Sequence, residues 1–96
     1  MFIFILTYQK PLEEVEKHLQ EHRIYLDTNY QAGHFIASGR QEPRIGGVIL
    51  CRAESKEKAQ EILVQDPFFI HQIAKYDVIE FLPAKYAEGF DRYINI

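Results

Sequence analysis

The sequence predicts an α+β sandwich with one antiparallel four-stranded sheet and two helices packed on a single face of it. Short stretches rich in β-branched and aromatic residues alternate with stretches of helical spacing in the order βαββαβ. The chain has 96 residues, of which 47% are hydrophobic. That is enough for one core and too little for two, so we expect a single domain over residues 1–96.

The first strand is predicted at residues 2–8, FIFILTY, because this run is β-rich and too short for a stable isolated helix. Apolar side chains would line both of its faces: Phe2, Phe4 and Leu6 one face, and Ile3 and Ile5 the other. A strand that is apolar on both faces has to be covered on both. The sheet is therefore expected to bury its second face as well.

The first helix is predicted to begin after Pro11, since proline favours the first helical position. Apolar residues then follow at helical spacing: Leu12, Val15, Leu19, Leu26 and Tyr30. His22 fills the gap in this stripe between Leu19 and Leu26. Gly33 offers the C-terminal stop.

The remaining elements follow from turn residues and caps. Strands are predicted at 34–39 (HFIASG), 48–53 (VILCRA) and 76–83 (YDVIEFLP), with a turn-rich connection RQEPRIGG after the first of these. Ser55 is expected to cap a second helix that ends near Gln65. Asp66-Pro67 then starts a short helical turn through about Ala74.

This order of elements is the split pattern of a ferredoxin-like sandwich, in which both helices lie on one face of the sheet. The other face, made apolar by the first strand, would expose a larger patch than monomers usually tolerate. We therefore expect a homodimer that stacks sheet on sheet. The apolar C-terminal tail, residues 84–96, is expected to dock on the domain or on its partner.

Composition excludes several classes of protein. The 11 Lys and Arg are spread along a chain that also carries 14 Asp and Glu, so no nucleic-acid footprint is expected. The single cysteine, Cys51, cannot form a disulfide framework or a paired redox motif. The N-terminal apolar run is too short for a membrane span and lacks the basic start of a secretory signal. We expect a cytoplasmic protein that acts away from membranes.

His22 and Asp66 are the main candidates for chemistry. A lone histidine on an apolar face is commonly a structural residue with a satisfied hydrogen bond, and Asp66 has an ordinary role as the cap before Pro67. If the short turn lies across the end of the first helix, however, Asp66 could orient the imidazole and fix its tautomer, as a general base requires. Both interpretations stay open at this point.

Three further residues are candidates for binding a substrate. Arg40 and Arg44 flank the connection after the second strand, where an arginine could clamp a carboxylate, although such residues are often solvated loop charges. Ser38 precedes Gly39 at the end of a strand, where a hydroxyl could approach a ligand. His18 and His22 form an i, i+4 pair, but without an acidic or cysteine partner of known spacing this is a weak metal motif, and no metal is expected.

Two long stretches, EHRIYLDTNYQAGHFIASGRQEPRIGGVIL and ESKEKAQEILVQDPFFIHQIAKYDVIEFLP, resemble the YciI-like, or YCII-related, proteins of the dimeric α+β barrel superfamily. The resemblance runs from the first strand to about Tyr86. Its most specific marks are His22 before Tyr25-Leu26, the strand FIASG, and the turn Asp66-Pro67-Phe68.

This resemblance implies a ferredoxin-like protomer, a dimer whose sheets face each other to form a dimeric α+β barrel, and a cleft with a catalytic His and Asp pair. By matching position, the pair is His22 and Asp66. The family often has Gly-Pro where this chain has Gly39-Arg40, which implies a more basic pocket mouth here. The chemistry attributed to the family is of the lyase or isomerase kind on small, often cyclic organic acids or phenols.

The leading hypothesis is a cofactor-independent enzyme in which His22 moves a proton, Asp66 orients His22, and Ser38, Arg40 and Arg44 hold an anionic small molecule. A second hypothesis is a dimeric module that binds a metabolite without transforming it. A third is a structural dimerisation unit in which Asp66 is only a cap. Haem is a minor option, with four candidate ligands: His18, His22, His34 and His71.

Overall fold

A computed structural model describes residues 1–94 and has the predicted order of elements, with a terminal 3-10 turn added. The elements are β1 (Phe2–Tyr8), α1 (Leu12–Gln31), β2 (Phe35–Arg40), β3 (Gly46–Cys51), α2 (Lys56–Leu63), α3 (Pro67–Ile70), β4 (Ala74–Glu80) and η1 (Phe90–Tyr93). The strands form one antiparallel sheet in the order β2-β3-β1-β4, so the predicted ferredoxin-like sandwich is confirmed. None of the helices in residues 1–94 is long and apolar enough to cross a membrane.

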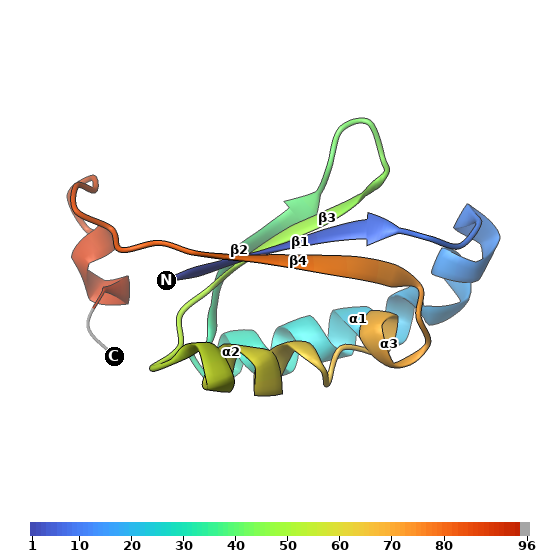
Figure 1. Ribbon diagram of the computed structural model, residues 1–96, viewed down its shortest axis with the longest axis horizontal. Coiled ribbons are helices and arrows are strands. Elements are labelled where there is room, and N and C mark those ends of the chain that lie inside the picture. Colours follow the sequence, from blue (N-terminus) through green and yellow to red (C-terminus); the bar gives the residue numbers. More distant parts are fainter. Residues whose placement is uncertain (95–96) are drawn as a thin grey trace.

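The core lies between the sheet and the helices, which all sit on one side of it (Figure 1). β1 occupies the centre of the sheet, and its side chains Phe2, Phe4 and Leu6 are buried against the helical layer. Val15 of α1 and Phe68 of α3 are equally buried in this core. The central position of β1 explains why its sequence is apolar on consecutive residues.

No helix covers the opposite face of the sheet in the described part of the chain (Figure 1), and part of this face is apolar. In the strand register, Ile3 lies between Leu50 of β3 and Ile79 of β4, and Ile5 pairs with Val48. Ile79 is 46% exposed. The two apolar faces of β1 are thus confirmed, whereas the sheet-on-sheet dimer stays a prediction.

Two predicted boundaries were wrong at the end of the helical layer. The helical turn does not reach Ala74, because α3 ends at Ile70 and Gln72 takes a positive φ of 55° that breaks the helix. Ala74 instead begins β4, paired with Tyr8, so this strand covers 74–80 rather than 76–83.

The strand predicted at 48–53 also begins earlier, at Gly46, a residue that the local pattern places in a turn. Gly46 pairs with Thr7, and a Cβ placed on it would lie 1.7 Å from the carbonyl oxygen of Leu6. Only glycine therefore permits the close approach of β1 and β3 here. The caps were predicted correctly, since Ser55 accepts a hydrogen bond from the Lys58 amide and Gly33 ends α1 with a φ of 81°.

The buried side of α1 differs in part from the predicted stripe. Leu12 and Tyr30 are exposed, whereas Tyr25 and Asn29 are buried. The Tyr25 hydroxyl donates to the carbonyl oxygen of Ile62 at 2.7 Å, so a polar group on the core side is satisfied by α2. Asn29 was not part of the predicted stripe, and its side-chain amide donates a hydrogen bond to the Tyr25 carbonyl oxygen at 2.9 Å.

The tail touches the domain through Arg52, which donates to the carbonyl oxygens of Gly33 at 2.7 Å and of Arg92 at 3.0 Å. Its aromatic residues contact one another, with 5.6 Å between the ring centroids of Phe90 and Tyr93. Residues 95–96 of the predicted tail lie outside the described residues. Docking of the tail on a partner and the extent of the domain over 1–96 stay predictions.

Candidate active site

A pocket of about 460 Å³ lies between α1 and the hairpin of β2 and β3. Its lining mixes apolar walls with hydroxyl, imidazole and guanidinium groups, contributed by Tyr8, Glu16, Leu19, His22, Arg23, Leu26, Ser38, Gly39, Arg40, Arg44, Gly46, Val48 and Phe68. Four of the five residues singled out from the sequence, His22, Ser38, Arg40 and Arg44, line it. The fifth, Asp66, lies behind His22 and does not reach the lining.

His22 and Asp66 are in direct contact. The Nδ1 atom of His22, in the middle of α1, lies 2.8 Å from Oδ1 of Asp66, the N-cap of α3. The Asp66 side chain is 0% exposed and that of His22 is 12% exposed. A buried carboxylate thus holds the inner side of an imidazole whose outer side lines the pocket.

Asp66 accepts two further hydrogen bonds. The backbone amide of Phe68 donates to Oδ1 at 2.9 Å, which is the predicted helix cap, and the Tyr76 hydroxyl donates to Oδ2 at 2.5 Å. An ionised carboxylate accepts hydrogen bonds and donates none. His22 therefore donates its Nδ1 proton to Asp66, which leaves the lone pair of the neutral ring on Nε2.

Tyr76 secures the far side of this carboxylate. Burial, followed by the negative charge of Asp66, raises the pKa of Tyr76 well above its usual value, so its hydroxyl keeps the donated proton at neutral pH. Tyr76 was not singled out from the sequence. Its place on the same face of β4 as Ala74 and Val78 was the available indication, since a tyrosine hydroxyl on an inward face requires a partner.

Phe68 fixes the plane of the imidazole. Its ring stacks on that of His22 with centroids 4.1 Å apart and an interplanar angle of 2°. The hydrogen bond to Asp66 restrains the rotation of the His22 ring, and the stacking restrains its tilt. The ring is therefore held in one orientation before any ligand enters.

Two of the arginines in the pocket already have acidic partners. Arg44 lies 3.0 Å from Glu16, and this hydrogen bond is the main cause that raises the pKa of Arg44, with Tyr8 adding to it. Arg40 bonds Glu42 at 2.9 Å on an exposed part of the hairpin. Their positive charges are thus partly compensated.

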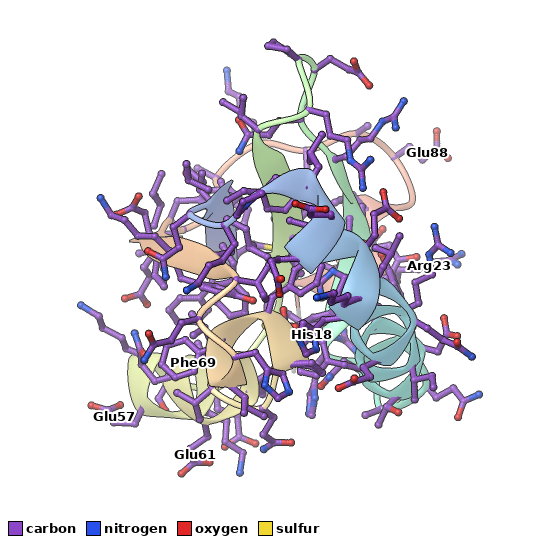
Figure 2. All side chains as sticks on the ribbon, turned by 90° about the vertical axis from the view of Figure 1, so that its right-hand side faces the viewer. His18, Arg23, Glu57, Glu61, Phe69 and Glu88 are labelled. Carbon is purple, nitrogen blue, oxygen red and sulfur yellow. The ribbon has the colours of Figure 1, made fainter. Side chains whose placement is uncertain are left out.

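Arg23 differs from these two. It lines the pocket directly after His22 and has no hydrogen bond or ion pair with any residue in 1–94. Figure 2 shows it pointing outward from α1. Its spacing from Leu19 and Leu26, at four and three residues, was the overlooked indication, because all three share the pocket side of α1.

Ser38 places a hydroxyl in the pocket from β2. Its oxygen lies 2.7 Å from the Tyr30 hydroxyl oxygen, and either hydroxyl can donate to the other. The proton of the accepting hydroxyl is then available to a ligand. Cys51 is not part of the pocket: it is fully buried, and burial raises the pKa of its thiol to about 12.

The other histidines lie outside the pocket lining. His34 Nδ1 is 2.9 Å from Oδ1 of Asn29, and the rings of His18 and His71 stack on each other. These contacts do not favour any one histidine as the haem ligand, so haem binding stays a prediction.

The chain matches the family model of the YCII-related domain over residues 1–82. Among solved structures it is similar to 5-chloro-2-hydroxyhydroquinone dehydrochlorinase (TftG) from Burkholderia phenoliruptrix AC1100, in complex with 2,5-dihydroxybenzoquinone. The TM-score is 0.70 at 17% identity, covering 84% of this chain and 93% of that chain. Similarity at this identity shows a shared fold. No curated protein matches the chain.

Proposed function

The chain belongs to the family of YCII-related domains, and from this premise we propose that it is a cofactor-independent enzyme that moves a proton on a small anionic organic molecule. One observation carries the proposal. His22 is oriented from behind by a buried carboxylate, so that Nε2 is the nitrogen available to the pocket. A general base needs this combination of fixed tautomer and open lone pair.

In the proposed reaction, Nε2 of His22 takes a proton from a carbon or hydroxyl of the substrate. Asp66, which does not touch the substrate, stabilises the imidazolium that forms. The electron pair left on the substrate either expels a leaving group, as in a lyase, or takes the proton back at another atom, as in an isomerase. Tyr76 and the Phe68 amide keep Asp66 in place throughout.

The pocket also supports an anionic, ring-shaped substrate. Arg23 offers an uncompensated positive charge beside His22, and Ser38 offers a hydroxyl. Leu26, Val48 and Phe68 offer apolar surfaces for a ring. The similar solved protein is named for its action on a chlorinated hydroxyhydroquinone and was solved with a dihydroxybenzoquinone. Hydroxylated aromatic compounds and small cyclic acids are therefore the first substrate classes to test.

The test is a panel of such compounds incubated with the protein in D₂O and followed by ¹H NMR. We expect the wild-type protein to catalyse the exchange of a substrate C–H or its conversion to a product, and Arg23→Gln to raise KM for the anionic members. Deuterium exchange that is equal with and without the protein, across a panel of compounds shown to bind, contradicts the proposal. A ligand that binds in the pocket and is recovered unchanged favours the binding module instead.

We also propose that the chain forms a homodimer through the uncovered sheet face and works in the cytoplasm. The row of Ile3, Leu50 and Ile79 across three strands supports the dimer, because such faces are rarely left exposed. Light scattering should give twice the monomer mass for the wild type and the monomer mass for Ile79→Lys. Ile70→Lys on the helical side is the matched control, since this isoleucine is also exposed. A monomeric wild type overturns the dimer.

A further inference from the structure

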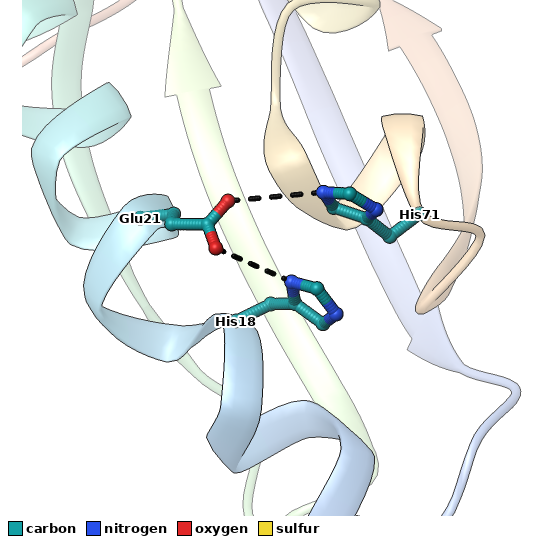
Figure 3. A group of neighbouring side chains, drawn as sticks. All are labelled: His18, Glu21 and His71. Carbon is teal, nitrogen blue, oxygen red and sulfur yellow. Dashed lines mark ion pairs between the residues drawn. The ribbon is translucent and has the colours of Figure 1, made fainter.

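A second group of potential ligands lies beside the pocket and is not part of it. His18 and Glu21 project from α1 toward His71, the residue that follows α3, as Figure 3 shows. Nδ1 of His18 is 3.5 Å from Oε1 of Glu21, and Nε2 of His71 is 3.7 Å from Oε2 of the same carboxylate. Figure 2 shows His18 where α1 meets α3. Two imidazoles thus converge on one carboxylate.

His18 has an unsatisfied polar atom in this group. Its Nδ1 atom is buried yet has no hydrogen-bond partner among the described residues. The approach of Glu21 at 3.5 Å is an ion-pair distance that does not meet hydrogen-bond geometry. Buried polar atoms are rarely left without a partner, because each one costs the free energy of its lost hydration.

The donor set suits a particular kind of ligand. Two histidine nitrogens and one glutamate oxygen are the three protein ligands of many zinc sites, in which a water completes the tetrahedron. We propose that His18, Glu21 and His71 bind a divalent cation of the zinc class.

The present spacing is close to that of such a site. All three ligand atoms lie within 4.8 Å of one another, whereas ligand atoms around tetrahedral zinc are about 3.4 Å apart. Glu21 and His71 have side chains that are 54% and 43% exposed, so both can shift by the required distance of about 1 Å without disturbing the core.

The cation would join two elements that carry the candidate active site. His18 lies one helical turn before His22 on α1, and His71 follows the helix that Asp66 caps. The site would therefore tie the helix bearing His22 to the segment bearing Asp66. The cation would thus stabilise the packing of α1 against the α3 region, and this role does not depend on the function proposed above.

Titration of ZnCl₂ into tag-free, chelator-stripped protein, followed by calorimetry, tests the proposal. We expect one site per chain and, at about a hundredfold excess over Kd, a rise in Tm of about 10 °C. Co²⁺ should give the intense visible bands of a tetrahedral complex, a signal that requires no catalytic activity. A wild-type chain that binds neither ion overturns the proposal.

Variants identify the ligands. His71→Gln and Glu21→Gln change exposed side chains and should each weaken binding by at least about a hundredfold, because even outer-sphere partners cost about 10–100-fold. His34→Gln is the matched control and should bind Zn²⁺ as the wild type does, since His34 bonds Asn29 outside the group. Unchanged binding in His71→Gln, or loss of binding in the control, overturns the assignment. The assignment is also overturned if Zn²⁺ binding is lost in His22→Gln and kept in His71→Gln.

Discussion

Two histidines one turn apart on α1 meet a carboxylate in opposite ways. His22 faces Asp66 at 2.8 Å, and Asp66 is fully buried and held by two other donors. His18 faces Glu21 at 3.5 Å, and this carboxylate is 54% exposed, with only its ion pair to His71 as a further contact among residues 1–94. Each imidazole also stacks on a ring from the α3 region with centroids 4.1 Å apart.

The comparison teaches that the carboxylate, more than the histidine, decides what such a pair can do. A buried carboxylate with all its partners in place fixes one tautomer and one ring orientation, which suits proton transfer. An exposed carboxylate can still move, which suits the capture of an ion from solvent. Four predictions sharpen this contrast, beginning with the largest effect.

His22→Ala should lower kcat on an identified substrate by about 10²–10⁴-fold, because it removes the proposed base. Circular dichroism should show an unchanged fold, since the ring lines the pocket and its loss leaves space that opens to solvent. His34→Gln serves as the control with an intact rate. Turnover by His22→Ala at the wild-type rate would exclude the role of His22.

Asp66→Ala should lower the free energy of unfolding by about 3–5 kcal/mol, because it leaves buried donors on Tyr76, Phe68 and His22 without their acceptor. Glu21→Ala, measured without added metal, should cost less than about 0.5 kcal/mol. Urea unfolding of the two variants gives both values. Equal losses of unfolding free energy in the two variants would contradict the contrast between a buried Asp66 carboxylate and an exposed Glu21 carboxylate.

Tyr76→Phe should cost about 1–2 kcal/mol, since it removes one of the three donors to Asp66. ¹⁵N NMR of the His22 ring should still show the proton on Nδ1, because the bond to the other oxygen of Asp66 remains. A change of tautomer in this variant would show that Tyr76 acts on the ring rather than on the carboxylate.

Alkaline pH should lower the free energy of unfolding, because Cys51 and Tyr76 are buried with raised pKa values. Burial raises the pKa of Cys51 from 9.0 to about 12 and raises that of Tyr76 from 10.0. The folded state thus keeps protons that the unfolded chain releases, so stability is fully present below about pH 9 and falls as the pH rises toward 12. Urea unfolding at a series of pH values should show a shallower fall for Cys51→Ala. A free energy of unfolding that rises with pH over this range would contradict the burial of the Cys51 thiol.

Local patterns predicted much of the fold. The caps at Ser55 and Asp66 and the stop at Gly33 depend on neighbouring residues, and all three are present. Gly46 was misassigned because its reason for being glycine is the Leu6 carbonyl, which lies on another strand. Such long-range causes leave no mark on the adjoining sequence.

The candidate site was likewise predictable only where its residues disturb a local pattern. His22 disturbs the apolar stripe of α1, so it was visible as an anomaly, and Asp66 was visible as a cap. Their contact spans 44 positions and depends on how α3 crosses α1, which periodicity does not encode. Tyr76 and Arg23 matter only through that arrangement, as one reaches Asp66 and the other borders the pocket without an acidic partner among residues 1–94.

Gly46 limits how this pocket can diversify. It lines the pocket, yet any side chain there would collide with the backbone of β1, so this part of the wall is fixed as bare main chain. Redesign of the pocket must therefore act at other positions, such as Val48 or Arg40 on the same hairpin. The main chain at Gly46 is thus a fixed part of the pocket wall, and the side chains around it are the positions open to substitution.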